Sequence, residues 1–492
     1  MPGSTGWHEE SKMARYRWYP TNTTLSDGTV LTTSGLTEPI EVLKDTARYP
    51  ELWQNGNWKR LKTARKDLPL YPWMFQAPNS QVFYAGAGND LAYLNPVGTG
   101  AWTPAPPLTP PRAFGERTYG TAAMFWPDRV LIAGGCDGNT VTNTAEILDL
   151  TSGTDGADPA SGLLRPVVTR APDMHERRWH ANSTILPDGT ILVTGGSRVN
   201  GASDPNQGVL EAEIWTPASG PNGPTGPGTW TTVAPMKEAR MYHSTAVLLP
   251  DGRVLSAGGE ENINYKPFQP NVNNHCTAET YSPPYLFKGA RPVIGSAPSY
   301  VGYGQPFRIQ ATPGSGTLAR ATLVRLSSVT HSFNMNQRFL ELSFGPGPAG
   351  TLTATAPGNA NDCPPGHYLL FVLNSQGVPS EAKTISIGSS TCGATVSVST
   401  TVTASTCTAS AVATVSGTNI NTDYRWFIDG VYQSGYNNQP SVTVPLDNCR
   451  PLVTFAVEVT PSCGGSPVYN FQSASVGSLY ANGSICGCGL SE

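Results

Sequence analysis

One short unit recurs along the first half of the chain and constrains the fold more than any other feature. An Asp-Gly dipeptide at Asp27, Asp188 and Asp251 is followed by a short, mostly apolar run that ends at a Gly-Gly or Ser-Gly pair. Asp-Gly beside such a run is a strong signal of a β-hairpin. We therefore expect a series of small antiparallel sheets.

The residue eight places before each turn belongs to a narrow set of types. The pairs of early residue and turn residue are Tyr19 and Asp27, His180 and Asp188, and His243 and Asp251. Weaker copies have Tyr71 eight residues before Asn79, and a turn at Asp128, where Gly134-Gly135 closes the strand one residue early. Five units are visible, and side chains able to bind a metal recur at one register.

The spacing and the outer segments of these units indicate a β-propeller. An outer strand follows each clear unit, as in Ala212-Glu213-Ile214-Trp215, and a tryptophan such as Trp230 ends several units. The intervals between turns run from 49 residues (Asn79 to Asp128) to 63 residues (Asp188 to Asp251). A period near 50 residues with Gly-Gly and a late Trp is typical of kelch blades.

Composition supports an all-β protein and excludes two classes of partner. Gly (52) and Pro (44) are abundant, and charged residues make up only 13% of the chain. The net charge of -4 gives no basic field for nucleic acid. No run of about 18 apolar residues is present to span a bilayer.

Three domains are expected from the changes in composition. Residues 1–287 contain the repeats and form the kelch propeller. Residues 288–388 contain strand-like apolar runs and form an Ig-like early-set sandwich. Residues 389–492 are rich in Thr, Ser and Val and form a second Ig-like or PKD-like sandwich, in which Trp426 is expected to be buried.

Cysteine usage favours an extracellular or cell-surface location. Six of the nine cysteines lie after residue 388, a density that suits disulfides in an oxidising compartment. Cys276 and Cys363 are expected either to form a disulfide or to remain free thiols. The first ten residues have no features of a secretory signal, so we expect the N-terminus to be internal to a longer protein.

Several motifs in the same order resemble the copper radical oxidases, in particular galactose oxidase and glyoxal oxidase. They are Tyr242-His243-Ser244 with the following Leu249-Pro250-Asp251-Gly252, then Tyr281-Ser282-Pro283-Pro284, then Thr330-His331-Ser332, then Pro364-Pro365-Gly366-His367-Tyr368 and Gly377-Val378-Pro379-Ser380. The resemblance covers roughly residues 12 to 390.

The resemblance implies one copper ion held by four residues. They are Tyr19, Tyr242, His243 and His331. Two imidazoles and two phenol oxygens are a borderline N/O donor set that suits tetragonal Cu(II), without the thiolates that favour Zn or Cu(I). A phenol, with a pKa of about 10, becomes a good ligand when a cation displaces its proton.

The resemblance also implies a mechanism and catalytic residues. The substrate would be a small primary alcohol, an aldehyde or a carbohydrate, and dioxygen would be reduced to hydrogen peroxide. Tyr19 would carry a tyrosyl radical as the second electron acceptor, and Tyr242 would act as the general base. His243 and His331 would fix the copper plane.

The sequence departs from the family pattern at three points. The radical tyrosine of the family is joined to a cysteine by a thioether bond, but no cysteine precedes Cys136, so the bond to Tyr19 cannot form. No tryptophan follows Ser34-Gly35 closely to stack on the radical. Pro72-Trp73 stands where galactose oxidase has a sugar-binding arginine, which argues against galactose as the substrate.

Two alternatives stay open on sequence alone. The family has seven blades and five are visible, so the chain is either part of a longer protein or a five-bladed descendant. The function is either the oxidase chemistry, in doubt because the crosslinking cysteine is missing, or a non-catalytic extracellular kelch protein. The latter would bind carbohydrate or a protein partner.

Overall fold

The computed structural model shows a chain built from β-strands. It describes residues 11–37, 46–54, 56–108, 111–150, 157–158, 163–164, 166–200, 204–220, 223–261, 273–347, 351–388, 395–403, 408–416, 422–429, 431–436, 439–445, 452–461 and 468–475. Within these ranges the helices are short 3-10 turns, at η2 (Pro205–Gln207), η3 (Pro284–Phe287) and η6 (Ser434–Tyr436). None of the helices in these ranges is long and apolar enough to cross a membrane.

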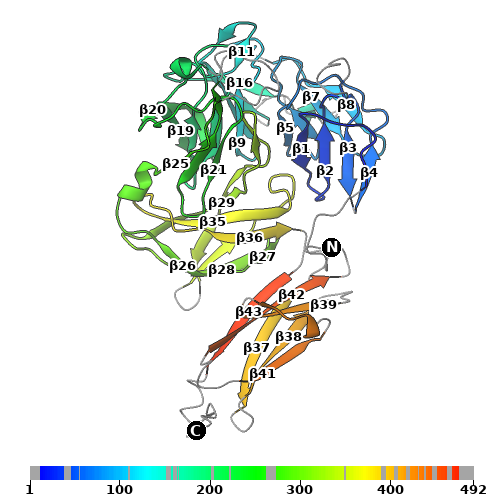
Figure 1. The fold of residues 1–492 in the computed structure, drawn as a ribbon, viewed down its shortest axis with the longest axis vertical. Helices are drawn as coiled ribbons and strands as arrows, with labels where there is room; N and C mark the ends of the chain where they lie inside the picture. The colour runs from blue at the N-terminus through cyan, green and yellow to red at the C-terminus, as the bar shows by residue number, and fades with distance from the viewer. Residues whose placement is uncertain are drawn as a thin grey trace. The chain divides into compact units, whose positions relative to one another are not determined.

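Five antiparallel sheets follow one another along the repeats, as the sequence predicts (Figure 1). The first contains β1 (Thr21–Thr24), β2 (Val30–Thr33), β3 (Glu51–Gln54) and β4 (Asn57–Arg60). The second contains β5 (Met74–Gln76), β6 (Val82–Tyr84), β7 (Ala92–Asn95) and β8 (Ala101–Pro104). The third contains β9 (Thr121–Trp126), β10 (Arg129–Ala133), β13 (Ala145–Asp149) and β16 (Val167–Ala171).

The last two sheets repeat the same up-and-down order. The fourth contains β17 (Asn182–Ile185), β18 (Ile191–Thr194), β19 (Ala212–Gly220) and β20 (Gly223–Val233). The fifth contains β21 (Ser244–Leu248), β22 (Val254–Gly258) and β25 (Ala278–Tyr281). Short two-stranded pairs lie between them, at β11 (Cys136–Asp137) with β12 (Thr140–Val141), β14 (Ala157–Asp158) with β15 (Leu163–Leu164), and β23 (Glu260–Glu261) with β24 (Asn273–Asn274).

The Asp-Gly turns form the hairpins between the first two strands of their sheets. In the fourth sheet, Asp188 accepts hydrogen bonds from the backbone nitrogen and the hydroxyl of Thr190, at 3.1 and 2.7 Å. Gly189 has a φ of +86°, in the left-handed region that glycine adopts without strain. The sequence therefore fixes this turn chemically, through an acceptor side chain followed by a glycine.

An arginine–glutamate pair joins the segment before the first strand to a later strand in four of the five sheets, and both partners are buried in all but the last pair. The pairs are Arg17–Glu51 (2.8 Å), Arg117–Glu146 (3.5 Å), Arg178–Glu213 (2.8 Å) and Arg240–Glu279 (3.4 Å). Each guanidinium also donates to a backbone carbonyl at the end of the second strand, as Arg178 does to Gly195 at 2.8 Å. These arginines thereby fasten the segment that enters each sheet.

A sandwich follows the repeats. One sheet has the order β26 (Val293–Ser296), β28 (Pro306–Thr312), β34 (Leu352–Thr355) and β33 (Phe344–Pro346). A second sheet contains, side by side in this order, β35 (Gly366–Asn374), β29 (Leu318–Arg325) and β32 (Phe339–Leu342). One hydrophobic core unites this region with the repeats, since Phe339 and Phe371 pack in the same cluster as Leu192 and Trp215.

A hairpin of the sandwich reaches the inner strands of the repeats. It consists of β30 (Val329–Thr330) and β31 (Phe333–Asn334), with His331 and Ser332 at its tip. β31 contacts β9 and β17, and β30 contacts β21. Phe333 is fully buried and lies edge to face with Phe75 at 5.6 Å.

The chain divides into two compact units, Met1–Ala297 with Pro306–Thr384, and Pro298–Gln305 with Ile385–Glu492. In the second unit β27 (Tyr300–Gly302) pairs in parallel with β36 (Lys383–Gly388). Its other strands form two sheets, one of β37 (Thr395–Thr403), β38 (Thr408–Ser416) and β41 (Ser441–Pro445), and one of β40 (Val431–Tyr432), β39 (Thr422–Ile428), β42 (Leu452–Pro461) and β43 (Val468–Ser475).

This second unit contains the expected buried tryptophan. Trp426 is fully buried and its indole nitrogen donates to Gln439 at 2.8 Å. The six C-terminal cysteines expected to form disulfides lie outside the described residues. The domain boundaries at 287/288 and 388/389 stay a prediction.

Candidate metal centre

One residue in each of the five sheets has a left-handed backbone just before the innermost strand. They are Tyr19 (φ 66°), Tyr71 (φ 49°), Tyr119 (φ 48°), His180 (φ 66°) and His243 (φ 60°). This conformation is rare for aromatic side chains and marks a backbone that its surroundings hold in place. Backbone bonds link neighbours of the set, since Tyr71 N donates to Tyr19 O at 3.2 Å and His180 N donates to Tyr119 O at 3.0 Å.

The left-handed residue folds its ring onto the ring before it in three sheets. Trp18 stacks on Tyr19 with centroids 3.4 Å apart and planes inclined by 14°. Trp179 stacks in the same way on His180 (3.6 Å), and Tyr242 on His243 (3.8 Å). Aromatic residues that are adjacent in the sequence thus form stacked pairs just before the innermost strands.

The four side chains expected to bind copper lie together. The hydroxyls of Tyr19 and Tyr242 are 2.8 Å apart, and the Tyr19 hydroxyl is 3.2 Å from Nε2 of His243. The His331 ring centroid lies 4.3 Å from that of Tyr19, 4.7 Å from that of His243 and 5.2 Å from that of Tyr242. The repeats supply three of these side chains and the tip of the sandwich hairpin supplies the fourth.

The two imidazoles of this set present the same nitrogen inward. His243 Nδ1 makes a short hydrogen bond to Glu260, and His331 Nδ1 lies 2.7 Å from the Thr330 hydroxyl. Nε2 of His243 faces Tyr19, whereas Nε2 of His331 is buried with no hydrogen-bond partner in the described part of the chain. A buried nitrogen without a partner is costly, and a metal ion would satisfy it.

The electrostatics keep His331 and His180 neutral near pH 7. Burial, helped by the nearby His243, lowers the pKa of His331 to about 3. Burial, helped by His331 and His243, also lowers the pKa of His180 well below its ordinary value. A neutral imidazole has a lone pair to offer a metal, so these environments suit ligand binding.

The donor set fits a copper ion. Two ligands at right angles, each about 2 Å from one ion, lie about 3 Å apart, which matches the 2.8 and 3.2 Å separations at Tyr19. No three His, Cys, Asp or Glu side chains in the described ranges gather into a metal-binding group. Phenol oxygens would therefore have to supply part of the set, as Cu(II) with mixed N and O ligands allows.

Three aromatic residues that the sequence did not assign to the site lie beside it. Tyr119 lies 4.4 Å from His180 and 6.1 Å from Tyr242 between ring centroids. The eight-residue spacing does not hold for Tyr119, because β9 has a bulge with one extra residue, opposite Arg129 and Val130, which shifts the count to the turn by one. Tyr71 stacks on His331 at 4.4 Å. Trp18 stacks on Tyr19 from the position before it, whereas the family resemblance predicts a stacking tryptophan after Ser34-Gly35.

Cys136, Cys276 and Cys363, the cysteines of the described region, form no disulfide with one another. The expected alternative of a bond between Cys276 and Cys363 is therefore wrong. Cys363 is buried whereas Cys276 is exposed, and an exposed thiol cannot reach one enclosed in the core without rearrangement.

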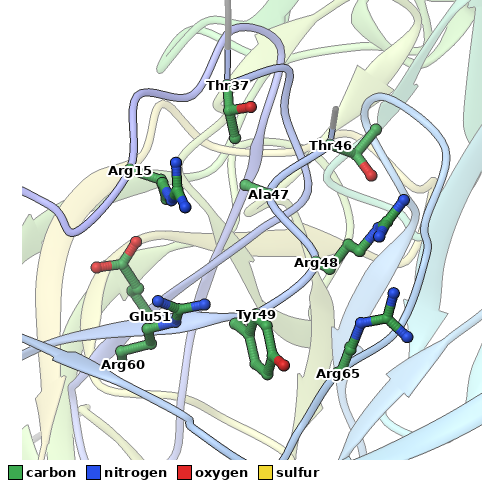
Figure 2. A pocket seen from close by; sticks show the side chains of 9 residues that line it. All are labelled: Arg15, Thr37, Thr46, Ala47, Arg48, Tyr49, Glu51, Arg60 and Arg65. Carbon is green, nitrogen blue, oxygen red and sulfur yellow. The ribbon is translucent and has the colours of Figure 1, made fainter. Parts of the chain in front are cut away.

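A separate cavity of about 130 Å³ lies in the first sheet (Figure 2). Its charged lining comprises four arginines and one acid, Arg15, Arg48, Arg60, Arg65 and Glu51. The acid is engaged by Arg17, and Arg48 pairs with Asp67 at 2.5 Å. The lining contains no imidazole or thiol, so this cavity is not the metal centre.

Known proteins match the chain over the same regions. The family model described as the galactose oxidase-like early set domain matches residues 291–387, and the kelch motif model matches residues 117–154. A solved structure, described as a novel fungal alcohol oxidase with catalytic diversity among the AA5 family, in complex with copper, has a TM-score of 0.65 and 26% identity. The match covers 77% of both chains.

Curated relatives show the same similarity. Aldehyde oxidase GLOX of Vitis pseudoreticulata is 29% identical over 78% of this chain and 75% of the relative. Galactose oxidase of Gibberella zeae is 27% identical over 78% of this chain and 56% of the relative. A WSC domain-containing protein of Arthroderma benhamiae is 30% identical over 79% of this chain and 41% of the relative. The chain is therefore similar to an aldehyde oxidase and to a galactose oxidase over more than three quarters of its length.

These similarities confirm the expected resemblance to the copper radical oxidases and the all-β fold class. The chain spans between 41% and 75% of the length of these three relatives. Two of these relatives are named as oxidases.

Proposed function

We propose that this chain provides the copper site of an oxidase that acts on primary alcohols or hydrated aldehydes. Two electrons and two protons leave the substrate and reduce dioxygen to hydrogen peroxide. The observation that supports this most is the meeting of the Tyr19 and Tyr242 hydroxyls, 2.8 Å apart, beside His243 and His331. The relatives named aldehyde oxidase and galactose oxidase support the same chemistry.

Tyr19, Tyr242, His243 and His331 would hold the ion. Copper bound there would accept one of the two electrons and bring the substrate oxygen next to the tyrosines. Tyr19 would accept the other electron as a tyrosyl radical, because copper alone shuttles one electron at a time.

The protein side chains would position and deprotonate the substrate. Tyr242 would take the proton of the substrate hydroxyl as general base. Its hydroxyl is already hydrogen-bonded to Tyr19. Trp18 covers one face of Tyr19 at 3.4 Å and would shield a radical there from solvent. His331 would stay a neutral ligand because burial lowers its pKa to about 3.

Galactose is not the substrate that the site favours. At the position where the resemblance places a sugar-binding arginine, Trp73 is only 3% exposed and packs into a core cluster. It offers no charged group to a sugar hydroxyl. A smaller alcohol or aldehyde fits this environment better, and six cysteines after residue 388 favour an extracellular location.

Copper titration tests the proposal. The protein should bind one Cu(II) with the electron paramagnetic resonance spectrum of mixed nitrogen and oxygen ligation. Tyr19→Phe and His331→Ala should each weaken binding at least tenfold. Tyr119→Phe is the matched control, since Tyr119 shares the left-handed register but is not a proposed ligand. Absence of Cu(II) binding by the unaltered protein would favour a non-catalytic kelch protein that binds carbohydrate or another partner.

A further inference from the structure

We propose that Glu260 is a positioning residue of the metal centre, which holds His243 with its Nε2 directed at the two tyrosines. The inference takes its metal from the proposed function, whereas the contact between Glu260 and His243 is observed independently of that function. Glu260 accepts a short hydrogen bond from His243 Nδ1, and its side chain is less exposed than the imidazole it holds (20% against 36%). The sequence motifs did not include it.

The backbone of Glu260 occupies a position that pairs in the same way in four of the five repeats. The residue after the glycine pair forms a bridge to the residue that precedes the left-handed one. These bridges are Trp18 with Leu36, Thr118 with Cys136, and Trp179 with Ser197. In the fifth sheet, Glu260 N donates to Tyr242 O at 2.9 Å. This backbone pairing therefore forms whatever side chain the residue carries.

The carboxylate of Glu260 is therefore an addition to the repeat. Equivalent positions carry Leu36, Cys136 and Ser197, none of which is charged. The acid occurs in the sheet whose left-handed residue is His243. A structural need common to the repeats would not select a carboxylate in this one sheet, whereas a need to orient His243 would.

Hydrogen-bond chemistry explains what the carboxylate does. An anion at Nδ1 favours the tautomer with the proton on Nδ1, which leaves the Nε2 lone pair free for a metal. Nε2 lies 3.2 Å from the Tyr19 hydroxyl. His331 has the weaker, neutral partner Thr330 at its Nδ1. The two imidazoles would consequently differ in donor strength, with His243 the stronger ligand.

The test compares Glu260→Gln and Glu260→Ala with a control variant. Glu238→Gln is the matched control, because Glu238 lies 3.0 Å from Nδ1 of His275 and neither residue is a proposed ligand. The first measurement is the tautomer of His243 in metal-free protein by nitrogen-15 nuclear magnetic resonance. We expect the Nδ1-protonated form in the unaltered protein and a mixture of both tautomers in Glu260→Ala.

The second measurement is Cu(II) affinity with the paramagnetic resonance spectrum of each complex. Loss of a carboxylate behind a histidine ligand weakens metal binding by about 10 to 100-fold, which we expect for Glu260→Ala. Glu260→Gln should lose less, because the amide oxygen can still accept from Nδ1. Glu238→Gln should bind as the unaltered protein does.

The outcomes separate this inference from the proposed function. Unaltered copper affinity and an unaltered His243 tautomer in Glu260→Ala would overturn the positioning role. If the unaltered protein bound no copper, the proposed oxidase would fail, yet the tautomer shift in metal-free protein would still uphold the contact of Glu260 with His243. If the unaltered protein bound no copper and Glu260→Ala also left the His243 tautomer unchanged, both the proposed oxidase and the positioning role of Glu260 would be overturned.

Discussion

Single residues in an unfavourable backbone conformation build the candidate site. Tyr19, His180 and His243 have φ values between 60° and 66°, and such residues cost about 1–3 kcal/mol each unless the surroundings fix them. Spacing from the Asp-Gly turn was enough to place these residues at one register. It did not predict that each ring would stack on the ring before it, because stacking depends on the sign of φ, which the sequence does not state. Trp18 was missed for this reason.

Thiol chemistry at two cysteines gives a prediction at the residue scale. Burial raises the pKa of the Cys363 thiol to about 11, so at pH 8 only about one molecule in a thousand carries the reactive thiolate. Cys276 is exposed. Iodoacetamide at pH 8 should label Cys276 within minutes and Cys363 only after unfolding, as measured by peptide mass spectrometry. Equal labelling of the two thiols in native protein would contradict their assigned burial.

Within each sheet, the sequence predicted the strands but not the ion pairs that fasten them. The hairpin turn and the apolar runs are local signals, so the order of the strands could be inferred. Arg178 and Glu213 are 35 positions apart and pair at 2.8 Å only because β18 and β19 are neighbours. A bulge in β9 likewise moved Tyr119 out of the register that the sequence indicated. Local patterns fix turns, whereas contacts between strands need the folded sheet.

The buried pair gives a prediction at the scale of the element. Glu213→Gln should destabilise the first unit by about 3–5 kcal/mol, because both partners are fully buried and Arg178 would lose its counter-charge. Thermal unfolding followed by circular dichroism measures the effect. Glu341→Gln is the control, since its pair with Arg320 is about one-third exposed and should contribute no more than about 1 kcal/mol. Similar losses in the two variants would show that burial does not set the strength of these pairs.

At the scale of the whole molecule, the site depends on segments more than 300 residues apart. Tyr19 comes from the first sheet and His331 from the sandwich hairpin, and their rings lie 4.3 Å apart. Neither composition nor periodicity brings these residues together, and the expectation that they meet came from a family resemblance. Glu260 lay outside that resemblance and became visible only in the folded chain. The sequence does not state which distant segments lie close together, and only the packing of the sandwich hairpin against the sheets brings these residues into contact.

The missing cysteine gives the last prediction, which concerns activity. In the family, a thioether bond lowers the cost of oxidising the radical tyrosine, but no cysteine precedes Cys136 here. Two effects then compete at Tyr19. Stacking on Trp18 at 3.4 Å spreads and shields a radical, but it adds no sulfur to the ring and so does not change the substituents that set its potential. We expect the missing bond to dominate.

Residues 1–492 loaded with Cu(II) should therefore show a stable copper spectrum and little hydrogen peroxide with either primary alcohols or glyoxal-type aldehydes. A peroxidase-coupled assay measures the peroxide, with galactose oxidase on galactose as the positive control. Robust turnover by this chain would show that stacking is sufficient. In that case Trp18→Leu should abolish turnover while copper stays bound, and Tyr242→Phe should lower turnover by about 100-fold or more because the general base is lost. Turnover unchanged in Tyr242→Phe would remove Tyr242 as the base, whatever its place among the ligands.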